Sequence, residues 1–308
     1  MRVTLVLRPA APPEEAAGRI EDLATRLPAE RKHVYGRGRS QICGVAGKEI
    51  ARIEEFAQAR GLRVIEADSA CGSVLLEGPV LAVERAFGVT LAVYEHELGS
   101  YRSHAGPVHV PAELEGLVEA VLGLDERPVV RRHSIGPPLR NQGSASPLEV
   151  AEAYEFPKDA AGRGQSIAIV ELCGGFFPSD MKNYFARLGL PAPKLRVREL
   201  EGQKNAPADA AAIRGFWESL PESAAHGGGL SAGQLEQIGW TIESTMDIQL
   251  AAALAPSARI TVYFAPITVQ GKFHAVRAVL NEAKDPAAIL SLSWGAREDG
   301  FNASSVSA

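Results

Sequence analysis

The sequence predicts two domains of mixed α and β structure, on three observations. Residues 1–127 read as alternating strands and helices that include a hairpin. Residues 128–147 change to a mixture of Arg, Pro, Gly and Ser. After that point, the continuous apolar runs Ser166–Leu172 and Ala288–Trp294 alternate with helical segments, a pattern typical of a buried parallel sheet wound on both faces.

The first domain shows period-2 alternation in its expected strands and a 3.6-residue period in its expected helices. The expected strands are Arg2–Leu7, Arg63–Ala67, Ser73–Glu77 and Thr90–His96, and the expected helices are Glu14–Leu27, Ile50–Arg60 and Val80–Phe87. Gly88 marks the end of the last helix. This order favours a ferredoxin-like α+β domain with helices on one face of an antiparallel sheet.

The second domain begins with a short helix and continues as an α/β alternation. Its expected helices are Leu148–Tyr154, Ser179–Leu188, a long one that ends at Ala255 before Pro256, and Phe273–Ala283. Its expected strands are Ser166–Leu172, Leu195–Leu200, Arg259–Phe264 and Ala288–Trp294. We expect the stretch Ala206–Gly233 to be rich in loops.

Composition excludes several classes of function. The 308 residues are 46% hydrophobic and 22% charged, with a net charge of −5 and no run of Lys or Arg, so a dedicated nucleic-acid binder is not expected. No stretch approaches the roughly 20 apolar residues of a membrane helix, and no membrane partner is expected. The N-terminus contains no recognisable signal peptide.

The three cysteines, Cys43, Cys71 and Cys173, are scattered and form no CxxC pair. Their odd number argues against a disulfide framework or a zinc site, so we expect buried thiols. The seven histidines form no metal-binding motif such as HExxH. No metal site is expected in this chain.

The candidate chemistry lies in the long helix, where Glu243 and Asp247 are four residues apart. This spacing places both carboxyl groups on one helix face, with Cβ atoms about 5–6 Å apart. Like charges at that distance raise the pKa of one member, which allows a pair of acids to share a proton. The pair can equally be two exposed acids on an ordinary helix, and spacing alone leaves both interpretations open.

A second candidate is Ser231, which lies in the overlapping strings HGGG and GxSxG of residues 226–233. In α/β-hydrolases these strings belong to two separate loops, and the serine follows a strand. No strand pattern precedes Gly227. We therefore expect a Gly-rich loop that caps the following helix, and we rank a hydrolase that uses Ser231 last.

The stretches around the acid pair resemble the serine-carboxyl peptidases (sedolisins), and in particular their kumamolisin-like members. In the second domain the resemblance is carried by Ser146–Pro157, Gly164–Leu172, Tyr184–Pro193, Thr241–Gln249, Ala253–Pro266 and Ile289–Gly295. In the first domain it is carried by Val83–Val89, Ser100–Ser103 and Ala120–Pro128. Nearly the whole chain is covered by independent strings.

The resemblance implies roles for particular residues. Glu243 matches the general base of the family, and Asp247 matches the acid that orients it. Glu171 and Trp294 match positions that extend the carboxyl network and line the substrate cleft. The edge Ser293–Gly295 would hold an extended peptide substrate as an added strand.

The resemblance also implies a domain organisation and partners. Residues 1–127 would be the activation (propeptide) domain, residues 128–147 a linker with a processing site, and residues 148–308 the first part of a subtilisin-like peptidase domain. The implied partners are peptide or protein substrates and the chain's own pro-domain docked on the cleft. By the same resemblance the protein would be extracellular.

The chain departs from the family pattern toward its C-terminus. The family's nucleophile lies in a Gly-Thr-Ser string and its oxyanion aspartate in Ala-Ala-Gly-Asp, and neither string occurs here. The family's calcium ligands would fall beyond Ala308, so no cofactor is expected in this chain. Ser304, Ser305 and Ser307 lack the required context, and we expect Ser244 to face away from the acids.

The expectation is therefore a pro-form of a serine-type acid endopeptidase, truncated before its catalytic serine and inactive as the chain stands. Losing one member of a catalytic triad leaves only residual catalysis, and here two functions are missing. The alternative is a non-catalytic inhibitor or folding assistant built on the pro-domain.

Overall fold

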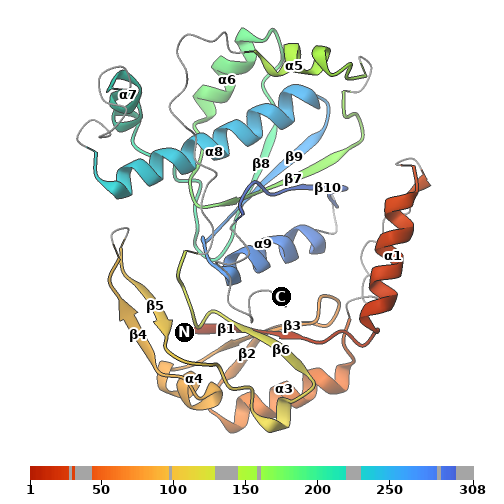
Figure 1. Cartoon of the computed structure of the whole chain (residues 1–308), viewed down its shortest axis with the longest axis vertical. Coiled ribbons are helices and arrows are strands. Elements are labelled where there is room, and N and C mark those ends of the chain that lie inside the picture. The colour runs from red at the N-terminus through yellow and green to blue at the C-terminus, as the bar shows by residue number, and fades with distance from the viewer. Residues whose placement is uncertain are drawn as a thin grey trace.

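In the computed structural model (Figure 1), the chain forms two units that contact each other through one helix. The structure describes residues 1–27, 30–31, 44–96, 99–128, 145–157, 161–219, 230–282 and 286–295.

The first unit is built on a four-stranded antiparallel sheet with the strand order β2-β3-β1-β6. Its strands are β1 (Arg2–Leu7), β2 (Arg63–Asp68), β3 (Ser73–Glu77) and β6 (Val118–Leu122), and its helices are α1 (Pro13–Thr25), α3 (Gly47–Ala59) and α4 (Val80–Phe87). Strands β4 (Leu91–Tyr94) and β5 (Tyr101–His104) form a separate antiparallel pair. The predicted ferredoxin-like arrangement is confirmed.

The core of the first unit lies between the sheet and helices α3 and α4. Val3 and Leu5 of β1 point into it and are fully buried, together with Ile53 of α3 and Phe87 of α4. Because side chains alternate along a strand, Thr4 points to the opposite face of the sheet, yet it too is completely buried. Something other than α3 and α4 therefore covers that face.

The second unit is a four-stranded parallel sheet with the order β10-β7-β9-β8. Its strands are β7 (Ser166–Leu172), β8 (Leu195–Glu199), β9 (Arg259–Ala265) and β10 (Ile289–Ser291), and its helices are α5 (Pro147–Ala153), α6 (Pro178–Arg187), α7 (Ala210–Ser219), α8 (Ala232–Leu254) and α9 (Val269–Asn281). All seven residues of β7 are buried, as its apolar sequence predicts.

Helices cover both faces of this parallel sheet, which confirms the predicted doubly wound architecture. Ile167 and Ile169 of β7 pack with α6 and α8, through residues such as Ile248. The intervening Ala168 and Val170 pack toward α9 on the other face. Glu171 has the parity of Ile169, so it belongs to the face covered by α8.

Helix α9 covers the second face of the first unit's sheet, and it lies between the two sheets in Figure 1. Thr4 Oγ1 forms a 2.8 Å hydrogen bond with His274 Nε2 and accepts one from Gln270 Nε2 at 2.9 Å. Arg277 Nη2 bonds Glu66 Oε2 at 3.0 Å. These polar contacts fix the position of the first unit on the second.

Most predicted elements occur within a few residues of their expected bounds, but four differences stand out. Strands β5 and β6 and helix α7 were not predicted, and β10 is confined to Ile289–Ser291 although Ala288–Trp294 was expected. Helix α7 interrupts the stretch predicted as loops, and Asp209 Oδ1 caps it by accepting from the backbone N–H groups of Ala211 and Ala212. Strand β5 was missed because its sequence, Tyr-Arg-Ser-His, has no apolar alternation.

The thiols differ from expectation. Cys71 and Cys173 are free but only partly buried, while Cys43 lies outside the described residues. None of the described helices has the length and hydropathy that crossing a bilayer requires.

Candidate active site

Helix α8 presents the predicted acid pair. The helix begins after Ser231, whose Oγ accepts from Gln234 N while the Gln234 side chain accepts from Ser231 N, forming a capping box. It ends at Leu254, two residues before Pro256. Ser231 is thus a helix N-cap, as expected.

The acids lie in the middle of this helix, and Glu243 is 7% exposed. Asp247 is partly buried. The burial of Glu243 does not fit two exposed acids on a solvent-facing helix, which was the plainer interpretation of the spacing.

A third carboxyl group comes from the sheet. Glu171, the penultimate residue of β7, is completely buried on the face covered by α8. The chain then turns tightly through Cys173 and Gly174, both with positive φ, and passes close to α8. A Cβ on Gly174 would lie 2.6 Å from the carbonyl oxygen of Trp240, so only glycine fits this approach.

Three hydrogen bonds connect the carboxyl groups to α8 and to the segment after β10. Ser244 Oγ donates to Glu171 Oε2 at 2.9 Å, and Trp294 Nε1 donates to the same oxygen at 3.1 Å. Ser293 Oγ donates to Asp247 Oδ2 at 2.5 Å. Residues from β7, from α8 and from the segment after β10 therefore meet in one cluster.

The electrostatics of the cluster follow from burial and like charge. Desolvation raises the pKa of Glu171 to about 8; the Asp247 charge adds to this rise, and the hydrogen bonds from Ser244 and Trp294 oppose it. Desolvation also raises the pKa of Asp247, against the hydrogen bond from Ser293. The charge of Glu243 contributes further to the raised pKa of Glu171. Near neutral pH the cluster therefore holds at least one proton.

The structure brings five of the six predicted site residues into this cluster: Glu171, Glu243, Asp247, Ser293 and Trp294. Gly295 follows Trp294 in the chain and is partly buried. The contacts of the first unit described above fall on α9, away from these carboxyl groups, and most of the expected linker lies outside the described residues.

Sequence reasoning missed Ser244, which was expected to face away from the acids. That expectation concerned Glu243 and Asp247 and is not contradicted, but the Ser244 hydroxyl bonds Glu171, the third carboxyl of the cluster. The available signal was burial: a serine on a helix face that packs against a sheet needs a polar partner there.

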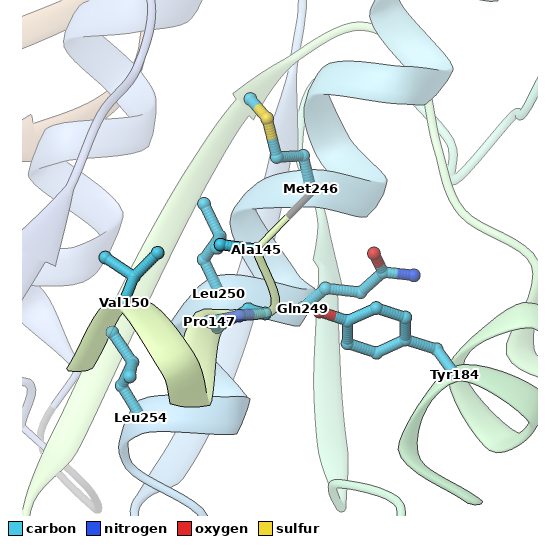
Figure 2. A pocket seen from close by; sticks show the side chains of 8 residues that line it. All are labelled: Ala145, Pro147, Val150, Tyr184, Met246, Gln249, Leu250 and Leu254. Carbon is cyan, nitrogen blue, oxygen red and sulfur yellow. The ribbon is translucent and has the colours of Figure 1, made fainter. Parts of the chain in front are cut away.

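A pocket of about 280 Å³ lies further along α8, between that helix and helices α5 and α6 (Figure 2). Met246, Leu250 and Leu254 of α8 line one side of it, and Val150 of α5 and Tyr184 of α6 lie across from them. No acidic side chain lines the pocket, so it is a feature separate from the carboxyl cluster.

A metal ion would need several donor side chains directed at one point. Within the described ranges, no group of three or more His, Cys, Asp or Glu side chains is arranged to hold an ion. Two of the clustered carboxyl groups, Glu171 and Asp247, instead accept hydrogen bonds from hydroxyl and indole donors.

A ferredoxin-like domain docked on a parallel-sheet domain with a buried carboxyl cluster agrees with what comparison with known proteins finds. Residues 3–127 match the family described as pro-kumamolisin, activation domain. Together with the relative described next, this match makes the chain similar to the pro-form of a serine-carboxyl peptidase (sedolisin).

A characterised relative with a similar sequence is Kumamolisin from Bacillus sp. (strain MN-32). The two sequences are 37% identical over 317 residues, which cover 99% of this chain and 52% of that protein. The chain thus spans about half the length of this relative.

Proposed function

We propose that this chain carries the acid half of a sedolisin catalytic centre together with its pro-domain. In this proposal Glu243 is the general base that would take the proton of a serine nucleophile, and Asp247 orients Glu243 and stabilises its charge. The observation that carries the proposal is the coupling of buried Glu171 to both acids, because a shared, desolvated carboxyl cluster is suited to holding and moving protons.

Carboxyl groups suit this role in an acidic medium. A histidine base with a pKa of about 6.5 would be protonated and unable to accept a proton there, whereas a carboxylate still accepts one. The proposed reaction is hydrolysis of peptide bonds, and extracellular action would fit it. The roles rest on side chains of this chain and call for no cofactor.

The proposed substrate position is the edge Ser293–Gly295, where an extended peptide would pair as an added strand. Ser293 connects this edge to the catalytic acids, since its hydroxyl donates to Asp247. A peptide seated there would lie next to the cluster. The pro-domain sheet itself contacts α9. Contact between the pro-domain and the cleft would therefore have to be made through the linker.

The 308 residues contain no Gly-Thr-Ser string to supply the nucleophile. We therefore propose that the chain alone does not hydrolyse peptides. The test is incubation of the purified chain with denatured casein at about pH 4, the range in which a carboxylate base works. No release of peptides is expected; release that disappears in Glu243→Gln would overturn this part of the proposal.

A second candidate function is inhibition of, or folding assistance to, a complete sedolisin by the pro-domain. It is favoured by the pro-domain having a hydrophobic core of its own, formed by the sheet with α3 and α4. Residues 1–127 added to an active sedolisin should then slow its hydrolysis of casein. Absence of inhibition against several sedolisins would remove this candidate.

A further inference from the structure

The buried carboxyl group of Glu171 is asymmetric. Its Oε2 accepts two hydrogen bonds, from Ser244 Oγ at 2.9 Å and from Trp294 Nε1 at 3.1 Å. Its Oε1 is equally buried but has no hydrogen-bond partner among the described residues. The two oxygens of one carboxyl group therefore meet very different surroundings.

Ser244 does not make the hydrogen bond that a serine within a helix usually makes. The ordinary acceptor would be the carbonyl oxygen four residues earlier, which belongs to Trp240. Gly174 passes close to that carbonyl and to the hydroxyl: a Cβ at Gly174 would lie 2.6 Å from Trp240 O and 3.0 Å from Ser244 Oγ. Ser244 is completely buried, and its hydroxyl is directed to Glu171.

We propose that Ser244 is a positioning residue which, together with Trp294, keeps Oε2 of Glu171 as an acceptor and thereby assigns the proton of the neutral acid to Oε1. A carboxylic oxygen that carries the proton is a donor and a poor acceptor, whereas the carbonyl oxygen accepts two hydrogen bonds. Two fixed N–H and O–H donors aimed at Oε2 therefore exclude the proton from it.

The consequence concerns the acid pair and rests on the proposed function. A neutral Glu171 removes one negative charge from the cluster of three carboxyl groups, so that Glu243 and Asp247 can ionise with less repulsion. Ser244 does not touch the reacting atoms in this account. It acts through Glu171.

The test measures titration rather than catalysis, so its failure is distinguishable from failure of the proposed peptidase role. The full chain is labelled with ¹³C at the glutamate carboxyl carbons, and Glu171 is assigned with Glu171→Gln. Ser244→Ala removes one donor to the ionised form, so the pKa of Glu171 should rise by about one unit. Ser244→Cys, which keeps the shape with a weaker donor, should give a smaller rise.

Two further measurements separate positioning from packing. Ser293→Ala removes a similar hydroxyl from Asp247 instead, and should leave the pKa of Glu171 within about 0.3 units of the wild-type value. The indole N–H proton resonance of Trp294, assigned with Trp294→Phe, should stay at a hydrogen-bonded position on both sides of the titration.

The proposal is overturned if Ser244→Ala lowers the melting temperature but leaves the titration of Glu171 unchanged, because Ser244 would then only fill space. It is also overturned if the Trp294 indole proton moves upfield when Glu171 is protonated, since that shift would place the proton on Oε2. A wild-type Glu171 that titrates near 4.5 would remove its basis altogether.

Discussion

Thr4 in strand β1 and His274 in helix α9 form a 2.8 Å hydrogen bond although 270 residues separate them in the chain. His274 also bonds Glu201, which follows β8, so one buried histidine joins the pro-domain to the parallel-sheet unit. Helix α9 serves both units: it covers one face of the parallel sheet and the second face of the pro-domain sheet. The parallel-sheet unit therefore has the first unit as a packing partner.

This joint leads to the first prediction. Thr4→Val keeps the shape of a fully buried side chain but removes the partner of His274 Nε2 and Gln270 Nε2. Leaving buried polar atoms without a partner costs roughly 1–3 kcal/mol, and the urea midpoint should fall accordingly. The matched control is Thr25→Val at the exposed end of α1, which should change stability by less than about 0.5 kcal/mol. Equal effects of the two changes would contradict the role of Thr4.

The second prediction concerns pH and Glu171. Its folded-state pKa of about 8 lies above its ordinary value of 4.5, so between these values the folded chain binds a proton that the unfolded chain has lost. Glu171 therefore makes the free energy of unfolding fall as pH rises from 4.5 to 8, by up to about 1.4 kcal/mol per pH unit. Urea unfolding of Glu171→Gln at pH 5, 6.5 and 8 should show a flatter pH dependence than the wild type.

The control for the pH experiment is Glu199→Gln. The hydrogen bond from Lys204 lowers the pKa of Glu199, so its linkage to folding acts below pH 4.5. The slope between pH 5 and 8 should therefore remain that of the wild type. Identical slopes in all three proteins would show that Glu171 is not protonated in the folded chain.

The third prediction uses two glycines with the same backbone conformation. Gly174 and Gly189 have φ of 73° and 70°, but a Cβ on Gly174 would meet Trp240 O while one on Gly189 meets nothing within 4 Å. Gly189→Ala should cost about 1–2 kcal/mol from the left-handed conformation alone. Gly174→Ala should cost clearly more and disturb the contact of the turn with α8; equal losses in thermal unfolding would argue against that close approach.

The fourth prediction separates capping from catalysis at Ser231. Ser231→Ala should lower stability by about 1 kcal/mol through loss of the N-cap of α8, whereas Ser231→Asp, which restores an acceptor, should recover most of that loss. Neither the wild type nor the variants should be labelled by a fluorophosphonate. Labelling that depends on Ser231 would favour the hydrolase interpretation over the sedolisin one.

Periodicity predicted the fold well where it was strong. Two elements form with their predicted bounds. Strand β7 (Ser166–Leu172) is a continuous apolar run, and helix α4 (Val80–Phe87) is an amphipathic stretch that ends at Gly88, so each pattern is compatible with one type of structure. Strand β5 has little apolar pattern and is held by pairing with β4, so the sequence could not show it. Strand β10 stops at Ser291, and Ser293 and Trp294 form side-chain bonds to Asp247 and Glu171.

The candidate site was only partly visible in the sequence. Spacing placed Glu243 and Asp247 on one helix face, but it could not show that Glu243 is buried and Asp247 partly buried. Glu171 came from the family resemblance, and no spacing rule connects it with Ser244, which is 73 positions away. That contact depends on the packing of α8 against β7, a tertiary relationship that neither segment encodes alone.

The central claim is that Glu243 and Asp247 form the base-and-acid pair of a sedolisin centre. The most direct measurement uses a chimera in which residues 1–295 are joined to the part of Bacillus sp. kumamolisin that follows the position matched to Gly295. The chimera should hydrolyse casein at about pH 4. Glu243→Gln should lower that rate by at least about 10³-fold, while Glu218→Gln, at an exposed carboxyl of α7, should leave it unchanged. A chimera that remains equally active with Glu243→Gln would contradict the account.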